Sequence, residues 1–336
     1  MRSSKLGGGN KLDSAKKVAE SSAIKLFYRL VVLHNDISPQ EQEFLLATIA
    51  KFSHFSSLEF INMDDKFARE WEVLGLRAHF AKEFFYKLLL TSYFKCDKVI
   101  VSDVDVVFLG DVSESFLAFD GDEYIAGVKA NNPNAIFPLD GWKSGYKNFS
   151  KKDFDAVKNG IGGGYLIANL KAWRRDKIEA KLIKYLYENA TNLVLAEQDV
   201  LNIICYPHIA TLSPAHIVCH ENWERLGSRW EKLVPEFYTQ DELDNARNHP
   251  IQLHFVGEKK PWRVPSVPKS EIWYEYIAKT TFARRFFNGL EGDIISAYQK
   301  RQFWSKVKGK FMKIAQIPHN VARRFCKYLC EKTLNL

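Results

Sequence analysis

Two aspartates interrupt the most strand-like segment of the chain. Residues 98–111 read KVIVSDVDVVFLGD, so Asp103 and Asp105 come directly after the strand-like run 98–101. Side chains at positions i and i+2 of a strand point to the same side. Two carboxylates that close repel each other by about 4 kcal/mol at an effective dielectric constant of about 20. The pair therefore requires a compensating partner, which is a shared proton, a basic residue or a cation.

The segments before this pair alternate between strand-like and helix-like patterns. Strands are predicted at 24–33 and 56–63 and helices at 40–52 and 78–94, the second of which leads directly into the strand at 98–101. This order is typical of an α/β fold with a largely parallel sheet and helices on both faces, in which ligands bind beyond the carboxyl ends of the strands. Later in the chain, the patterns predict strands at 123–129, 165–170 and 251–255, helices at 176–189, 197–205 and 270–288, and a loop at 131–149.

The position of the two aspartates favours a metal site. Paired oxygen ligands suit Mg²⁺ or Mn²⁺, which keep open positions for phosphate oxygens. The same D-x-D-x-V pattern also fits the aspartyl pair of haloacid-dehalogenase-type phosphotransferases. Those enzymes normally carry the pair near the start of the chain, followed by a later paired-acid loop that is not obvious in this sequence.

The positive charge of the chain is concentrated at its carboxyl end. The formal net charge is +8, but residues 297–336 contain ten Lys or Arg and one acid, so the other 296 residues sum to −1. No apolar run approaches the roughly 20 residues of a membrane-spanning helix, and residues 1–10 lack the apolar core of a secretory signal. The five cysteines form no C-x-x-C pair, which favours reduced thiols in a cytosolic protein.

The basic segment has the pattern of an amphipathic helix. Phe303, Val307, Phe311 and Ile314 form one apolar stripe among lysines, and a second basic stripe follows Pro318. Such helices suit an anionic membrane surface, at roughly 1 kcal/mol per basic residue. A nucleic-acid-binding tail or a solvated face is the alternative. The aromatic side chains on one side of the helix favour the membrane, so nucleic acid is not expected as a partner.

Two further motifs, G-I-G-G-G at 160–164 and E-Q-D-V-L-N at 197–202, carry polar or glycine residues next to predicted elements. The glycines precede a strand instead of opening a helix, unlike a dinucleotide-binding loop, so they predict a close backbone approach to a ligand or a tight turn. Acids at a helix N-terminus are favoured by the helix dipole. That explains Glu197, but it explains less well why Gln198 and Asp199 follow it.

The string H-F-V-G-E-K-K-P-W at 254–262 is the most specific in the chain. His254 ends a predicted strand and can supply a third metal ligand, although a lone histidine is more often structural. Gly257 permits a sharp turn. Lys260 can balance phosphate charge as a point donor.

Taken together, these motifs resemble those of glycosyltransferase family 8. D-V-D, N-L-K-A-W-R at 169–174, E-Q-D-V-L-N and H-x-x-G-x-x-K-P-W occur in the family's order, over about residues 25–275. The resemblance implies a GT-A fold, a Rossmann-like mixed but mostly parallel sheet, and a retaining, metal-dependent sugar transfer. The family includes bacterial lipopolysaccharide glucosyl- and galactosyltransferases.

The resemblance also implies roles for single residues. Asp103, Asp105 and His254 would bind Mn²⁺ (or Mg²⁺), which bridges the diphosphate of a UDP-sugar, and Lys260 would neutralise the same diphosphate. Gln198 corresponds to the family's amide beneath the anomeric carbon and Asp199 to an acid that holds the donor sugar's hydroxyls. Gly257 and Lys87 also fall in the predicted donor-binding site. No hydrolase-like carboxylate pair is visible, which favours front-face attack over a covalent adduct.

The sequence departs from the family pattern at three places. Gly162 stands where the family usually has Asn, and Lys87 stands where it usually has Arg. A lysine cannot replace an arginine fully, because it does not form the two parallel hydrogen bonds of a guanidinium group. The family's first apolar strand, which binds uracil and ribose, is replaced within residues 1–20 by MRSSKLGGGNKLDSAKK.

These observations predict a catalytic domain at 1–292 and a membrane-associating tail at 293–336. The expected function is transfer of glucose or galactose from a UDP-hexose to a lipid-linked or lipopolysaccharide glycan. The expected location is the cytoplasmic face of a bacterial inner membrane. An inactive family member that binds glycan or membrane is the alternative, followed by the D-x-D phosphotransferase.

Overall fold

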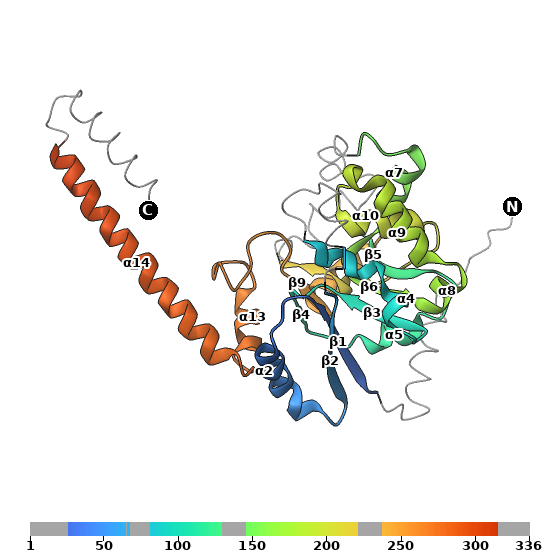
Figure 1. Ribbon diagram of the computed structural model, residues 1–336, viewed down its shortest axis with the longest axis horizontal. Coiled ribbons are helices and arrows are strands. Elements are labelled where there is room, and N and C mark those ends of the chain that lie inside the picture. The colour runs from blue at the N-terminus through green and yellow to red at the C-terminus, as the bar shows by residue number, and fades with distance from the viewer. Residues whose placement is uncertain (1–25, 65, 68–80, 130–145, 221–236, 315–336) are drawn as a thin grey trace. The chain divides into compact units, whose positions relative to one another are not determined.

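The computed structural model describes residues 26–64, 66–67, 81–129, 146–220 and 237–314 (Figure 1). The chain divides into two compact units, residues 1–276 and 277–336. The predicted boundary at 292/293 falls inside helix α14 (Ala283–Ile314), and the division of function between domain and tail stays a prediction. Among the helices of the described ranges, none is both long enough and apolar enough to cross a membrane.

The described strands of the first unit form three sheets. The first is the pair β1 (Tyr28–His34) and β2 (Ser56–Asn62). The second has the order β3 (Lys98–Ser102), β6 (Ile161–Asn169), β5 (Ile125–Lys129) and β7 (Ile209–Thr211). The third has the order β4 (Val106–Phe108), β9 (Gln252–His254) and β8 (Val218–Cys219).

The strand directions confirm a mixed α/β fold, but parallel pairs do not predominate among the described strands. β1 with β2, β5 with β7 and β8 with β9 are parallel. β3 with β6, β5 with β6 and β4 with β9 are antiparallel. The prediction of a largely parallel sheet was therefore wrong in this respect. The reason is that β6, which carries the glycine motif, runs antiparallel to both β3 and β5. In addition, β9, which carries His254, runs antiparallel to β4.

Helices and 3₁₀ turns connect these strands. The helices are α2 (Pro39–Ile49), α4 (Leu90–Tyr93), α5 (Ser113–Ala118), α7 (Lys151–Lys158), α8 (Leu170–Arg175), α9 (Ile178–Asn189), α10 (Ala196–Cys205), α12 (Gln240–Asn248) and α13 (Ser270–Ile277). The 3₁₀ turns are η1 (Ala50–Phe52), η2 (Lys82–Leu88), η3 (Ala190–Asn192) and η4 (Pro214–His216). Helix α2 begins with a capping box, because Ser38 and Glu41 each bond the other's backbone N–H.

Strand β6 lies at the centre of the main core. Its segment from Tyr165 to Ala168 is at most 1% exposed, because β3 and β5 flank its two edges and α10 contacts it. Trp173 on α8 is fully buried and donates its indole N–H to the carbonyl of Tyr124 at 2.9 Å. Helices α8, α9 and α10 lie close to these strands in Figure 1.

The structure corrects two predicted elements that contribute to the site. The helix predicted at 78–94 is, from residue 81 on, the 3₁₀ turn η2 followed by the short helix α4. Four consecutive residues of η2, 85–88, are buried, so this segment is enclosed on all sides and does not present one helical stripe. The G-I-G-G-G motif does not precede the strand predicted at 165–170, because its residues from Ile161 on belong to β6.

The second unit consists, within its described residues, mainly of α14. Phe303 and Trp304 on this helix are 61% and 64% exposed. The helix extends through the first predicted apolar stripe and ends at Ile314. The second stripe, beyond Pro318, and the replaced segment at 1–20 lie outside the described residues.

Candidate functional site

The D-V-D segment connects two sheets. Strand β3 ends at Ser102 and β4 begins at Val106, so Asp103 and Asp105 lie in the turn where the chain passes from one sheet to the other. The backbone N–H of Asp103 donates to the carbonyl of Gly164 at 3.1 Å, which fixes the turn to β6. Val104 between the two aspartates is 93% exposed. The two carboxylates are thus held at the surface end of the sheet by backbone contacts.

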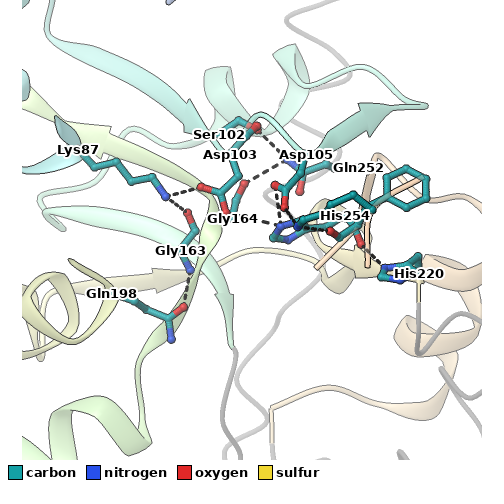
Figure 2. Close-up of polar contacts among 12 residues, drawn as sticks. Lys87, Ser102, Asp103, Asp105, Gly163, Gly164, Gln198, His220, Gln252 and His254 are labelled. Carbon is teal, nitrogen blue, oxygen red and sulfur yellow. Dashed lines mark hydrogen bonds and ion pairs between the residues drawn. The ribbon is translucent and has the colours of Figure 1, made fainter. Parts of the chain in front are cut away.

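His254 completes a three-residue cluster with the two aspartates (Figure 2). It ends β9, and its Nε2 lies 3.1 Å from Oδ1 of Asp105 and 3.6 Å from Oδ2 of Asp103. One ligand atom from each residue lies within 4.8 Å of the other two. Gly164 makes room for the imidazole, because a Cβ at this position would lie 2.6 Å from Nδ1 of His254.

Each aspartate also has its own lysine. Nζ of Lys260 bonds a carboxylate oxygen of Asp105 and donates to the carbonyl of Phe255 at 2.6 Å. Burial alone would raise the pKa of Asp105, but the hydrogen bond from His254 and the contact with Lys260 outweigh it and lower that pKa to about 2. Lys87 bonds Asp103 in the same way. The repulsion expected between the two carboxylates is therefore balanced by basic residues.

Lys87 is the centre of a buried polar network. Besides Asp103, its Nζ contacts Oε1 of Glu197 at 3.1 Å and the carbonyl of Gly163 at 3.0 Å. Burial would lower the pKa of Lys87, but the charges of Glu197 and Asp103 outweigh it and raise that pKa. Burial raises the pKa of Glu197, and the charge of Lys87 opposes this shift. Lys87 therefore remains protonated between Glu197 and Asp103.

The start of α10 brings Glu197 and Gln198 to the same place. Oε1 of Gln198 accepts the backbone N–H of Gly163 at 2.8 Å. Sequence reasoning assigned Glu197 only to the helix dipole and missed its contact with Lys87. The signal for it was the run of three polar residues at the start of an apolar helix. Its partner, 110 positions away in the sequence, is not visible in a local pattern.

Asp199 has different contacts from the other predicted site residues. It is 1% exposed, and Oδ2 accepts the backbone N–H groups of Val194 and Leu195 at 2.7 and 2.8 Å. The hydroxyl of Tyr146 donates to Oδ1 at 3.2 Å. Burial raises the pKa of Asp199. These contacts hold the segment before α10, and among the acids of the motif it is Glu197 that faces Lys87 and Asp103.

The glycine residues are explained by the protein's own side chains. A Cβ on Gly160 would lie 2.2 Å from Cγ of Asn202, and one on Gly163 would lie 3.3 Å from Oε1 of Glu197. The predicted close approach thus occurs, but to side chains of α10 and β9. Gly257 has φ +83° and provides the turn predicted between His254 and Lys260.

The cluster of Asp103, Asp105 and His254 fits a divalent cation. Two carboxylate oxygens and one imidazole nitrogen are ligands that Mn²⁺ and related cations accept. Three protein ligands leave coordination positions for phosphate oxygens or water. The arrangement is therefore suited to hold a diphosphate next to a buried, charged network.

A family model described as Glycosyl transferase family 8 matches residues 11–264. General stress protein A of Bacillus subtilis (strain 168) is 23% identical over 269 residues, which cover 75% of this chain and 82% of that protein. Human Glycosyltransferase 8 domain-containing protein 2 is 26% identical over 212 residues, which cover 56% of this chain and 55% of that protein.

Two solved structures share the fold. The WbbM bifunctional glycosyltransferase has a TM-score of 0.62 at 22% identity, covering 83% of this chain and 50% of that chain. The galactosyltransferase LgtC, solved with donor and acceptor sugar analogs, has a TM-score of 0.57 at 20% identity, covering 81% of this chain and 92% of that chain. This chain therefore spans only about half of the human protein and of WbbM.

Proposed function

Because this chain belongs to glycosyltransferase family 8, we propose that it is a metal-dependent, retaining hexosyltransferase that uses a UDP-hexose as donor. The observation that carries the proposal is the Asp103, Asp105 and His254 cluster flanked by two lysines. The donor sugar is glucose or galactose, and the acceptor is a lipid-linked or lipopolysaccharide glycan. Family membership speaks against the D-x-D phosphotransferase.

In this proposal the cluster binds the diphosphate end of the donor. Asp103, Asp105 and His254 would hold Mn²⁺ or Mg²⁺, which would supply positive charge to stabilise the departing UDP. The ammonium group of Lys260 bonds the carboxylate of Asp105, so it is positioned to add positive charge beside the same phosphates. Gly257 allows the chain to turn so that His254 and Lys260 reach the site together.

The network around Lys87 lies on the other side of Asp103 and binds the sugar end. Lys87, Glu197 and Gln198 present one ammonium group, one carboxylate and one amide, which are groups that bond sugar hydroxyls. Gln198 accepts the N–H of Gly163 at 2.8 Å and is, in this proposal, the amide beneath the reacting carbon. The family resemblance assigned Asp199 to the donor sugar's hydroxyls, but its carboxylate bonds the backbone of Val194 and Leu195. We therefore propose that Asp199 orients these residues through the loop before α10. Attack from the front face explains retention without a protein nucleophile.

The acceptor is proposed to be reached at a membrane. Helix α14 exposes Phe303 and Trp304 within a basic segment, and basic amphipathic helices bind anionic lipid surfaces. A lipid-linked glycan would be found there. The proposed location is the cytoplasmic face of a bacterial inner membrane.

The proposal is tested by calorimetric titration of the full chain with UDP, with and without Mn²⁺. The wild type and Asp105→Asn are compared, with Asp122→Asn as the control because the side chain of Asp122 is 89% exposed. Mn²⁺-dependent binding that Asp105→Asn abolishes and Asp122→Asn retains is the expected result. An affinity for UDP that changes neither with Mn²⁺ nor in Asp105→Asn would refute the metal site.

Turnover is measured separately, as hydrolysis of UDP-glucose and UDP-galactose and transfer to glycan acceptors. Transfer or hydrolysis of one donor identifies the hexose. Tight, metal-dependent UDP binding without turnover of either donor would instead support a member of the family that binds without catalysis.

A further inference from the structure

Gln252 is a fully buried polar side chain next to the metal cluster, at 0% exposure. It begins β9, two residues before His254, so both side chains point to the same face of the strand. Opposite them on β4 lie Phe108 and Val106. Gln252 and His254 are thus neighbours on the face of β9 that contacts β6.

The amide of Gln252 joins the two sheets that supply the predicted metal ligands (Figure 2). Its Nε2 donates to Oγ of Ser102 at 3.0 Å and to the carbonyl of Gly164 at 3.3 Å. Ser102 ends β3 and Gly164 belongs to β6, whereas Gln252 belongs to β9. One side chain therefore connects three strands where the D-V-D turn passes from one sheet to the other.

Both acceptors of this amide also contact Asp103. The Ser102 hydroxyl donates to the carbonyl of Asp103 at 2.9 Å, and the Gly164 carbonyl accepts the N–H of Asp103 at 3.1 Å. Ser102 and Gly164 thus each link the backbone of Asp103 to the side chain of Gln252, two residues before His254. The distance between Asp103 and His254, 3.6 Å from Oδ2 to Nε2, depends on how these strands are held together.

The same amide also carries a cost for stability. Its Oε1 is buried and has no hydrogen-bond partner within the described part of the chain, and burying an amide oxygen in this way costs free energy. If Gln252 were replaced by an apolar residue of its size, the Gly164 carbonyl would keep the N–H of Asp103 and the Ser102 hydroxyl would keep its acceptor. An apolar residue therefore removes a cost and leaves no new unpaired group.

We infer that Gln252 is a positioning residue for the cation: it sets the separation of Asp103 and His254 by joining β9 to β3 and β6. This role rests on the proposed metal-dependent function. Groups that orient metal ligands from outside the coordination sphere change metal affinity by about 10- to 100-fold when they are removed. The loss of Gln252 should therefore reduce affinity for the cation without reducing the stability of the metal-free protein.

The test compares Gln252→Met with wild type in the full chain. Affinity for Mn²⁺ is measured by the electron paramagnetic resonance signal of the free ion, with and without saturating UDP, and stability by thermal unfolding without metal. We expect Gln252→Met to bind Mn²⁺ about 10-fold or more weakly with an unfolding midpoint equal to or above that of wild type. Unchanged Mn²⁺ affinity would overturn the role.

Asn202 provides a matched control, because it is also a buried amide that bonds β6. Its Oδ1 accepts the N–H of Ile161 at 2.8 Å and its Nδ2 donates to the carbonyl of Ile161 at 3.0 Å. Asn202→Leu should lower the unfolding midpoint and leave the Mn²⁺ affinity of the folded protein unchanged. An equal loss of Mn²⁺ affinity in this variant would mean that any weakening of the sheet acts on the site, which overturns a specific role for Gln252.

Ser102→Ala tests the same connection from β3 and serves if Gln252→Met does not fold. It should also weaken Mn²⁺ binding, and the double variant should lose no more than the larger single loss. Independent, multiplicative losses would contradict a shared path. Absence of Mn²⁺ binding by the wild type, with or without UDP, would instead overturn the metal-dependent function itself.

Discussion

Replacement of Lys87 by methionine is the most informative perturbation of the buried network. Methionine keeps most of the side-chain volume but removes the only ammonium group that the described residues place between Asp103 and Glu197. The side chains of Lys87 and Glu197 are only 10% and 8% exposed. Removal of one partner from a buried ion pair costs about 3–5 kcal/mol, because the other charge stays buried without compensation. We therefore expect Lys87→Met to lower the free energy of unfolding by about 3 kcal/mol or more.

The assay is urea unfolding of the full chain at pH 7.5 without metal, for Lys87→Met, Glu197→Gln and the double variant. Glu197→Gln removes the charge that Lys87→Met leaves unpaired, so the double variant should recover about 1–3 kcal/mol of the sum of the single losses. Lys184→Met is the control, because Lys184 is 74% exposed and its Nζ lies 3.8 Å from Glu188. The control should change stability by less than about 0.5 kcal/mol.

Additive losses in the double variant would refute this reasoning, because they would mean that Lys87 and Glu197 do not act as a pair. A loss below about 1 kcal/mol in Lys87→Met, in the range of an exposed ion pair, would also refute it. In that case water or a proton on Glu197 would have replaced the lysine without cost.

Three further predictions concern the site, the pH dependence and the tail. Gly164→Ala should weaken Mn²⁺ binding about 10-fold or more, because its Cβ would lie 2.6 Å from Nδ1 of His254, whereas Gly163→Ala, with 3.3 Å to its nearest neighbour, should retain it in the same titration. Burial lowers the pKa of His216 below 6.5, so the unfolded chain binds a proton that the folded protein does not. As the pH is lowered from 6.5, the free energy of unfolding measured with urea should therefore decrease by up to about 1.4 kcal/mol per pH unit. The decrease should be smaller in His216→Asn. Deletion of 297–336 should release the protein from anionic vesicles in a flotation assay, and undiminished flotation would contradict a membrane role for the tail.

The sequence patterns located most of the site because its residues lie in short, ordered motifs. The strand before Asp103, the histidine at the end of β9 and the turn to Lys260 are all set by local rules of alternation, strand ends and glycine. The grouping of the two aspartates with His254 came from the resemblance to glycosyltransferase family 8, and the structure places the three side chains together. These parts required no knowledge of tertiary contacts.

The remaining parts of the site depend on contacts between distant segments. The pairing of Lys87 with Glu197 spans 110 positions, and no periodicity reveals it. The direction of β6 could not be inferred, because its apolar run fits either orientation. Its glycines resembled a loop since local propensity disfavours glycine in strands, and only the imidazole of His254 and the amide of Asn202 explain why no larger residue fits.

The lysines on the two aspartates have a consequence for how ligands bind. Without a ligand, the carboxylates of Asp103 and Asp105 are already neutralised by Lys87 and Lys260. A bare cation therefore competes with a resident ammonium group, whereas a cation that arrives with a diphosphate offers Lys260 a new anionic partner. This predicts positive heterotropic coupling, in which Mn²⁺ and UDP each raise the affinity of the other by the same factor. In the proposed function, the site would therefore bind the metal–nucleotide complex more tightly than either component alone.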